Sequence, residues 1–255
     1  MPDSAFGLGA REKEFRHATP PCGDDGSLAA LRQAIVLVLE EERPSLADQA
    51  SSDALSDLLL ATSSGYRRGS LAALMSLELG GSPRTAWRVG AAVEFTHAAS
   101  LILDDLPSMD DAAMRRDKPP LHARVGEAPA ILAAVALINR ANAILSTLDL
   151  PADWRALLVT RLSDGIAAGC DGQLRDLIGW PDGVTGQARL EHALAVHGKK
   201  TSAVFSTAVA LGAISATGGE AGYLSVLCGR IAFRIGLIYQ VHDDWNDFAE
   251  DRANG

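Results

Sequence analysis

The chain has 255 residues, of which 47% are hydrophobic and 5% aromatic, and its formal net charge is −9. The length suits one large domain with a buried core, and the acidic balance argues against a nucleic-acid partner. Three widely spaced cysteines argue against a disulfide framework or zinc site and favour a reducing cytoplasm. The longest apolar run, 128–138, is too short to span a bilayer, and the start of the chain lacks a signal-peptide pattern.

Residues 1–26 are rich in Gly, Pro and charged side chains without a sustained period, which predicts a flexible N-terminal arm. Ser27 is a candidate N-cap for the first helix, and Ser82 with Pro83 starts another. Further helical patterns fit 51–62, 67–79, 83–105, 127–148, 152–177, 187–197, 200–216 and 220–248, with a polar loop over 107–124. No alternating strand pattern persists, so we predict one all-α domain over 27–255.

Two clusters of aspartates each follow a strongly apolar helical segment. The first contains Asp104, Asp105, Asp110 and Asp111, and the second contains Asp243, Asp244 and Asp247. Carboxylates three and four residues apart on a helix share one face, which Gln240 extends in the second cluster. One such cluster alone is typical of a solvated helix end. Two clusters at the edge of a core are costly unless cations neutralise them, and these hard oxygen ligands suit Mg²⁺ bridged to phosphates.

Basic side chains complete this pattern. Arginine pairs stand at 67–68 and 115–116, and Lys199 and Lys200 open a predicted helix. Guanidinium groups match phosphate oxygens, and a helix N-terminus adds oriented N–H groups. Each pair alone is typical of a solvated surface. Together with the acidic clusters, the basic pairs indicate a metal–diphosphate site.

Several stretches resemble the trans-prenyltransferases, the isoprenyl diphosphate synthases that make farnesyl and geranylgeranyl diphosphate. They are EFTHAASLILDDLPSMDDAAMRRDKPPLHARVGEAPAILA, GCDGQLRDL, HGKKTSAVFSTAVALGA and IGLIYQVHDDWND, in the order of the family's motifs. The resemblance runs from about residue 55 to residue 248. It implies an isoprenoid synthase-type helical bundle around a central cavity, and a homodimer.

The resemblance also implies a role for individual residues. The ligands of roughly three Mg²⁺ ions would be Asp104, Asp105, Asp110, Asp243, Asp244 and Asp247. The allylic diphosphate would contact Arg115, Lys200 and Gln240, and the diphosphate of isopentenyl diphosphate would contact Arg68, His97 and Arg116. Thr201 would lie near the reacting carbon, so that Lys200, Thr201 and Gln240 form the catalytic group.

In bacterial farnesyl-type members, the fifth residue before the first aspartate is usually aromatic and closes the cavity floor. Ala99 stands there, followed by Ser100, and Thr96 and Ala92 lie one and two turns deeper. These small side chains favour a geranylgeranyl (C20) product, unless a bulky side chain from another helix fills the same space.

The sequence departs from the family's pattern in two places that matter for function. Gly65 stands where the family usually has a lysine for isopentenyl diphosphate, although Arg67 could substitute for it. The sequence given ends soon after Asp247, so the usual C-terminal helices are expected to be short or missing.

The leading hypothesis is a Mg²⁺-dependent enzyme that condenses an allylic diphosphate with isopentenyl diphosphate. The first alternative is a prenyltransferase that uses a different acceptor. The second is a non-catalytic partner subunit of a prenyl synthase. A class I terpene cyclase is disfavoured because its second metal motif normally carries an Asn-Ser/Thr-Glu pattern, which residues 243–247 do not match.

Overall fold

The computed structural model describes residues 25–44, 46, 48–60, 65–116, 118–179, 183, 185–219 and 222–254. At residues 25–27, 224–225, 243–244 and 246–254 only the backbone is described. The expected arm therefore lies outside the described residues, apart from the first residues of a helix.

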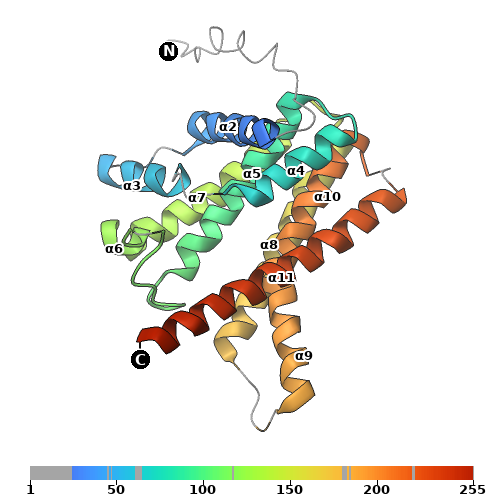
Figure 1. The fold of residues 1–255 in the computed structure, drawn as a ribbon. Coiled ribbons are helices and arrows are strands. Elements are labelled where there is room, and N and C mark those ends of the chain that lie inside the picture. The colour runs from blue at the N-terminus through green and yellow to red at the C-terminus, as the bar shows by residue number, and fades with distance from the viewer. Residues whose placement is uncertain are drawn as a thin grey trace.

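The described chain is a bundle of helices, as the sequence predicts (Figure 1). The elements are α2 (Asp25–Glu42), α3 (Gln49–Leu59), α4 (Arg67–Glu78), α5 (Pro83–Asp104), α6 (Leu121–Val125), α7 (Glu127–Ser146), α8 (Ala152–Ile178), α9 (Gly186–His197), the π-helical turn η1 (Gly198–Ser202), α10 (Ala203–Thr217) and α11 (Gly222–Asn254). The predicted all-α fold is confirmed.

Three local predictions differ from the structure. Ser27 lies inside α2, which begins at Asp25, so it is not the N-cap. The predicted polar loop contains the short helix α6. Lys199 and Lys200 do not open a helix, because α9 continues through η1 into α10 without a break. Their backbone N–H groups therefore do not form a free helix N-terminus.

Helix α5 lies at the centre of the bundle and contacts α2, α4, α7 and α10. Its N-terminus is capped as predicted, since the Ser82 side chain accepts a hydrogen bond of 3.2 Å from the Thr85 N–H. Small buried residues along α5 allow neighbouring helices to approach closely. Where α4 crosses α5, a Cβ on Gly69 would lie 2.5 Å from the carbonyl oxygen of Gly90, so this crossing requires glycine.

The turn η1 is held between two helices by glycine contacts. A Cβ on Gly172 of α8 would lie 2.4 Å from the Lys200 nitrogen, and a Cβ on Gly236 of α11 would lie 2.6 Å from the Ser202 Cα. In Figure 1, α11 is the long red helix that crosses the bundle, and it contacts α9, η1 and α10. These close approaches fix the position of η1, and therefore of Lys200 and Thr201.

Within the described ranges, α7 is the helix long and apolar enough to cross a membrane by length and composition alone. In the structure, 39% of its apolar window is buried. A core helix that never meets a membrane passes the same test, so this observation is weak evidence for a span.

Candidate active site

A largely apolar cavity of about 280 Å³ opens between α5, α7, α8 and α10. Its apolar wall includes Val93, Ile138, Leu162, Ile166 and Val204. The polar side chains of His97, Asp104, Gln173 and Lys200 also line it. The predicted central cavity is therefore present, and its largely apolar wall includes these four polar side chains.

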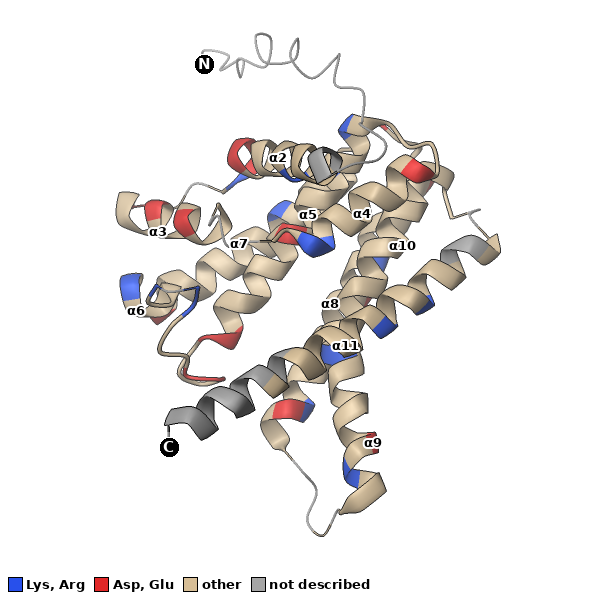
Figure 2. Ribbon diagram, viewed as in Figure 1, with Lys and Arg blue, Asp and Glu red and all other residues tan. Residues whose placement is uncertain are grey.

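The C-terminal end of α5 gathers the first aspartate cluster. Asp104 is the last residue of α5, and the Asp110 N–H donates a 3.0 Å hydrogen bond to the Asp104 carbonyl oxygen, which folds the following loop back. Figure 2 shows these acidic segments at the end of α5 and in the loop after it. Burial raises the pKa of Asp104 to about 6, and the neighbouring Asp110 contributes to the rise. A cation beside this carboxylate would offset that cost.

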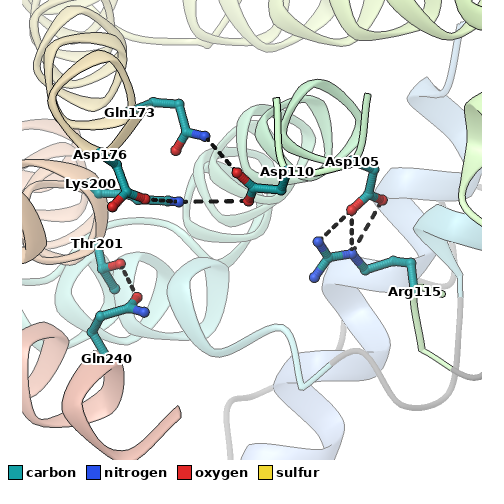
Figure 3. Close-up of polar contacts among 8 residues, drawn as sticks. All are labelled: Asp105, Asp110, Arg115, Gln173, Asp176, Lys200, Thr201 and Gln240. Atoms are coloured by element: carbon teal, nitrogen blue, oxygen red, sulfur yellow. Dashed lines mark hydrogen bonds and ion pairs between the residues drawn. The ribbon is translucent and has the colours of Figure 1, made fainter. Parts of the chain in front are cut away.

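Lys200 connects the aspartate loop to α8 (Figure 3). Its Nζ donates a 2.7 Å hydrogen bond to Asp176 and lies 3.8 Å from an Asp110 carboxylate oxygen. Gln173 also donates to Asp110, at 3.3 Å. Burial works against the charged form of Lys200, but the hydrogen bond to Asp176 and the charges of Asp176, Asp104 and Asp110 together outweigh it and raise the lysine pKa. Lys200 is therefore held as a cation at the cavity.

Thr201 and Gln240 meet across η1 and α11 (Figure 3). The Thr201 hydroxyl donates a 2.6 Å hydrogen bond to the Gln240 side-chain oxygen. Thr201 is buried and Gln240 is half-buried. A hydroxyl that donates its hydrogen in this way keeps its acceptor lone pairs for another group.

The side chains of Arg115 and Arg116 point in different directions from a tight turn. Backbone hydrogen bonds between Arg115 and Lys118 close the turn, and Arg116 takes a left-handed φ of 54°. The Arg115 guanidinium forms a 2.5 Å ion pair with the buried Asp105 carboxylate. Arg116 instead donates a 3.2 Å hydrogen bond to the Leu58 carbonyl oxygen. The turn therefore presents two neighbouring cations to two different regions.

Arg68 lies beside His97, with 2.9 Å between Nη1 and Nε2. Arginine has only donors, so this histidine nitrogen is the acceptor. Desolvation, followed by the charges of Arg68, Arg116 and Arg115, lowers the pKa of His97 well below its ordinary value. The histidine is therefore neutral, and it orients the guanidinium without adding charge.

A buried carboxylate holds the backbone next to Arg68. Glu94 accepts a 2.6 Å hydrogen bond from the Gly69 N–H, directly after Arg68. Burial raises the pKa of Glu94, while that hydrogen bond and the nearby Arg68 and Arg116 act in the opposite direction. Glu94 thereby fixes the first turn of α4, which carries Arg67 and Arg68. We refer to Arg67, Arg68, His97 and Arg116 as the cation wall.

Comparisons with known proteins agree with this arrangement. The family model of polyprenyl synthetases matches residues 53–254. The chain belongs to the polyprenyl synthetase family. It is 32% identical over 256 residues to a probable farnesyl diphosphate synthase of Sinorhizobium fredii, covering 97% of this chain and 74% of that protein. It is 42% identical over 179 residues to the farnesyl diphosphate synthase of Escherichia coli, covering 68% of this chain and 58% of that enzyme.

A solved polyprenyl synthetase relative has the same architecture. The apo structure of a FPP/GFPP synthase from Zymomonas mobilis superposes with a TM-score of 0.77 at 27% identity, over 86% of this chain and 80% of that one. Among the first curated relatives, the chain spans between 50% and 74% of their own lengths. The family and fold expected from the sequence are thus confirmed.

Two residues of this polyprenyl synthetase site were not assigned a role from the sequence. Gln173 and Asp176 hold Asp110 and Lys200, and they lie three residues apart on one face of α8. The signal was available, because both belong to the stretch GCDGQLRDL that resembles a family motif. Their spacing showed a shared face but not which loop they would meet.

Ala99 and Ala92, expected in or near the cavity floor, do not line the cavity. Both are fully buried among neighbouring helices. The cavity-facing residues of α5 include Val93, Thr96 and Ser100. One residue along a helix turns the side chain by about 100°, so the floor face of α5 passes through Ser100 and Thr96.

The aspartates at the end of α5 offer carboxylate oxygens, the ligands that Mg²⁺ prefers. Asp104 among them lines the cavity. The Asp105 carboxylate faces Arg115. No three His, Cys, Asp or Glu side chains among those described gather closely enough to hold a metal ion. Asp243, Asp244 and Asp247 lie on α11, the helix that also carries Gln240, but their side chains are outside the described part. The available donors fit Mg²⁺ in type.

Proposed function

We propose that this protein is a Mg²⁺-dependent prenyltransferase that condenses an allylic diphosphate with isopentenyl diphosphate. The observation that carries the proposal is one largely apolar cavity whose lining includes Asp104, Lys200 and His97. An apolar chain with a charged end fits such a cavity. The names of the relatives, farnesyl and geranylgeranyl diphosphate synthases, support the same reaction class.

The allylic diphosphate is assigned to the region of Asp104, Asp105 and Asp110, which we call the aspartate side. Asp104, Asp105, Asp110, Asp243, Asp244 and Asp247 would hold Mg²⁺, which would neutralise the charge that develops on the leaving diphosphate. Arg115, Lys200 and Gln240 are assigned to the same diphosphate. Lys200 supports this assignment, because it is already a cation within reach of Asp110. The number of ions, roughly three, belongs to the proposal.

The diphosphate of isopentenyl diphosphate is assigned to Arg68, His97 and Arg116. The neutral His97 leaves the positive charge of the guanidiniums undiminished, and Glu94 fixes the turn that carries Arg68. Charge-assisted bonds from arginine to phosphate are among the stronger hydrogen bonds in proteins. The two substrates would then approach each other along α5.

The reaction follows from this placement. The allylic C–O bond breaks, and its electron pair leaves with the diphosphate. The double bond of isopentenyl diphosphate attacks the resulting carbocation, and the released diphosphate accepts the proton that is lost. The oxygens of Thr201 and Gln240 stabilise the cation, and the apolar wall excludes the water that would trap it.

A C20 product is part of the proposal. No Phe, Tyr or Trp is among the described residues that line the cavity, and Ser100 and Thr96 leave room along α5. The bulky groups at its wall are aliphatic, such as Ile138 and Leu162. A longer prenyl chain is therefore not stopped by an aromatic floor.

We also propose a homodimer in the cytoplasm. Ile131, Leu132 and Val135 on α7 are 40%, 65% and 48% exposed, and a second copy could cover this apolar face. Replacing Leu132 with Glu should shift the dimer to monomer in sedimentation, without loss of helicity. An unchanged sedimentation coefficient would count against this face.

The deciding experiment incubates the protein with Mg²⁺, isopentenyl diphosphate and a C5, C10 or C15 allylic donor, and identifies the products by mass spectrometry. We expect a C20 diphosphate. Donor consumption only with another nucleophile present would indicate a different acceptor. No turnover alone, but altered product length when mixed with an active synthase, would indicate a partner subunit.

A further inference from the structure

The side chain of Arg67 lies across Gly65. A Cβ on Gly65 would meet the Arg67 Cγ at 3.2 Å, its Nε at 3.3 Å and its Cζ at 3.6 Å. The space that a side chain at position 65 would enter is therefore occupied by the side chain of Arg67. Tyr66, between them, has a left-handed φ of 43° and is the N-cap residue of α4. This bend in the backbone directs the first residue of α4 back over position 65.

The Arg67 guanidinium reaches the same aromatic ring as Arg68. Arg67 Nη1 donates a 2.8 Å hydrogen bond to the Tyr239 hydroxyl, and its guanidinium carbon lies 5.2 Å from the ring centroid. The Arg68 guanidinium lies 5.9 Å from the same centroid. Tyr239 immediately precedes Gln240 on α11. The ring therefore keeps two guanidiniums near each other, beside the helix that also carries Gln240.

The contacts of Arg67 are with neutral groups. Among the described residues, no carboxylate lies within ion-pair distance of it, and its partner Tyr239 is a phenol. Arg68 and Arg116 add positive charge to the same region, since both act on His97 and Glu94. The buried Glu94 carboxylate lies near Arg68 and Arg116, but its hydrogen bond is with the Gly69 N–H and not with Arg67. Arg67 is exposed, so a ligand can reach it from solvent.

We propose that Arg67 is a further binding residue for the diphosphate of isopentenyl diphosphate, and that it supplies the positive charge which Gly65 cannot. This inference rests on the proposed function, because it names one more contact of the same substrate. Gly65 makes the arrangement possible, since any larger side chain there would meet the Arg67 stem.

The first test replaces Arg67 with Ala and measures steady-state kinetics for both substrates. The Michaelis constant for isopentenyl diphosphate should rise about tenfold, the effect of losing one charge-assisted contact, and that for the allylic donor should stay within about twofold. Arg67→Lys should recover part of the loss. Arg234→Ala, an exposed arginine on α11, is the control with the same change in net charge. An unchanged Michaelis constant for isopentenyl diphosphate in Arg67→Ala would overturn the inference.

The second test uses the space shared by residues 65 and 67. Gly65→Lys alone should change the Michaelis constant for isopentenyl diphosphate little, because Arg67 already supplies the charge. In the Arg67→Ala background, where the space is free, Gly65→Lys should restore most of the lost affinity. The two substitutions should therefore be strongly non-additive. Additive effects would show that the two positions do not serve one subsite, which contradicts the inference.

A binding measurement separates this inference from the proposed reaction. Isopentenyl diphosphate is titrated calorimetrically into wild type and Arg67→Ala in the presence of EDTA. Binding by wild type that weakens about tenfold in the variant supports the role of Arg67, even if no product forms with Mg²⁺ and donor. Equal binding by both proteins, or none by wild type, overturns it.

Discussion

The aspartate side of the cavity and the cation wall hold their charges in opposite ways. On the aspartate side, Asp105 pairs with Arg115, and Lys200 lies between Asp110 and Asp176. On the cation wall, Arg67 donates to the Tyr239 hydroxyl and Arg116 to the Leu58 carbonyl oxygen, both of which are neutral groups. In the first region the two cations are paired with carboxylates, whereas in the second Arg67 and Arg116 keep their charge available to a ligand.

This difference predicts different responses to substrate. An anion can bind the cation wall with little rearrangement, because its guanidiniums are already oriented by a ring, a neutral histidine and a buried carboxylate. A metal–diphosphate group must first separate Arg115 from Asp105. The aspartate side therefore changes shape on binding, and the cation wall does so less.

The largest effect is expected from Asp104→Ala. It removes a carboxylate at the end of α5 that lines the cavity, so kcat/KM should fall at least about 100-fold, with little change in melting temperature. Asp164→Ala, at an exposed position on α8, is the control. A wild-type rate for Asp104→Ala would show that the aspartate side does not hold the metal.

The next effect tests how η1 is positioned between the two regions. A Cβ at Gly172 would lie 2.4 Å from the Lys200 nitrogen, so Gly172→Ala should displace Lys200, lower kcat and destabilise the fold by about 1–3 kcal/mol. Gly229→Ala is a matched control on α11, where an added Cβ meets nothing within 4 Å. It should stabilise by about 0.5–1 kcal/mol. If both variants behaved alike in thermal unfolding and turnover, the close approach of Gly172 to Lys200 would not be needed for stability or activity.

A more specific effect concerns the apolar cavity that joins both regions. Thr96 lines this cavity, so Thr96→Phe should shorten the main product by one or more isoprene units with the fold intact. Ala99 is fully buried elsewhere, so Ala99→Phe should instead cost about 1–3 kcal/mol of stability. Product chain lengths by mass spectrometry and melting curves distinguish these results. A shorter product from a stable Ala99→Phe protein would restore Ala99 as the floor residue.

The same pair shows how far the sequence could predict this molecule. Helix positions, chain order and family follow from local patterns, and the Ser82 cap is confirmed. The prediction that Ala99 lies at the cavity floor was wrong. Neighbouring residues on a helix point about 100° apart, and the way α5 packs against other helices determines which of them faces the cavity. The glycine contacts of η1 and the hydrogen bond from Arg67 to Tyr239 depend on chain segments that meet only in the folded protein.

The smallest effect is a pH dependence of the cation wall. The pKa of His97 is held well below 6.5 by desolvation and then by Arg68, Arg116 and Arg115, while Glu94 also lies nearby. Below about pH 6.5, His97 therefore binds a proton in the unfolded chain but stays neutral in the folded protein. This part of the stability is present above that pH and is lost as the pH falls.

In denaturant unfolding, the free energy of wild type should thus decline below about pH 6.5 by up to about 1.4 kcal/mol per pH unit from this one group. His97→Gln keeps an acceptor for Arg68 but cannot titrate, so its profile should be flatter by that amount. His122→Gln, on α6, is the matched control. Parallel profiles for wild type and His97→Gln would mean that His97 takes up its proton at the same pH in the folded and the unfolded chain. Below that pH the cation wall would then hold four positive groups, and a neutral histidine could not be what orients Arg68.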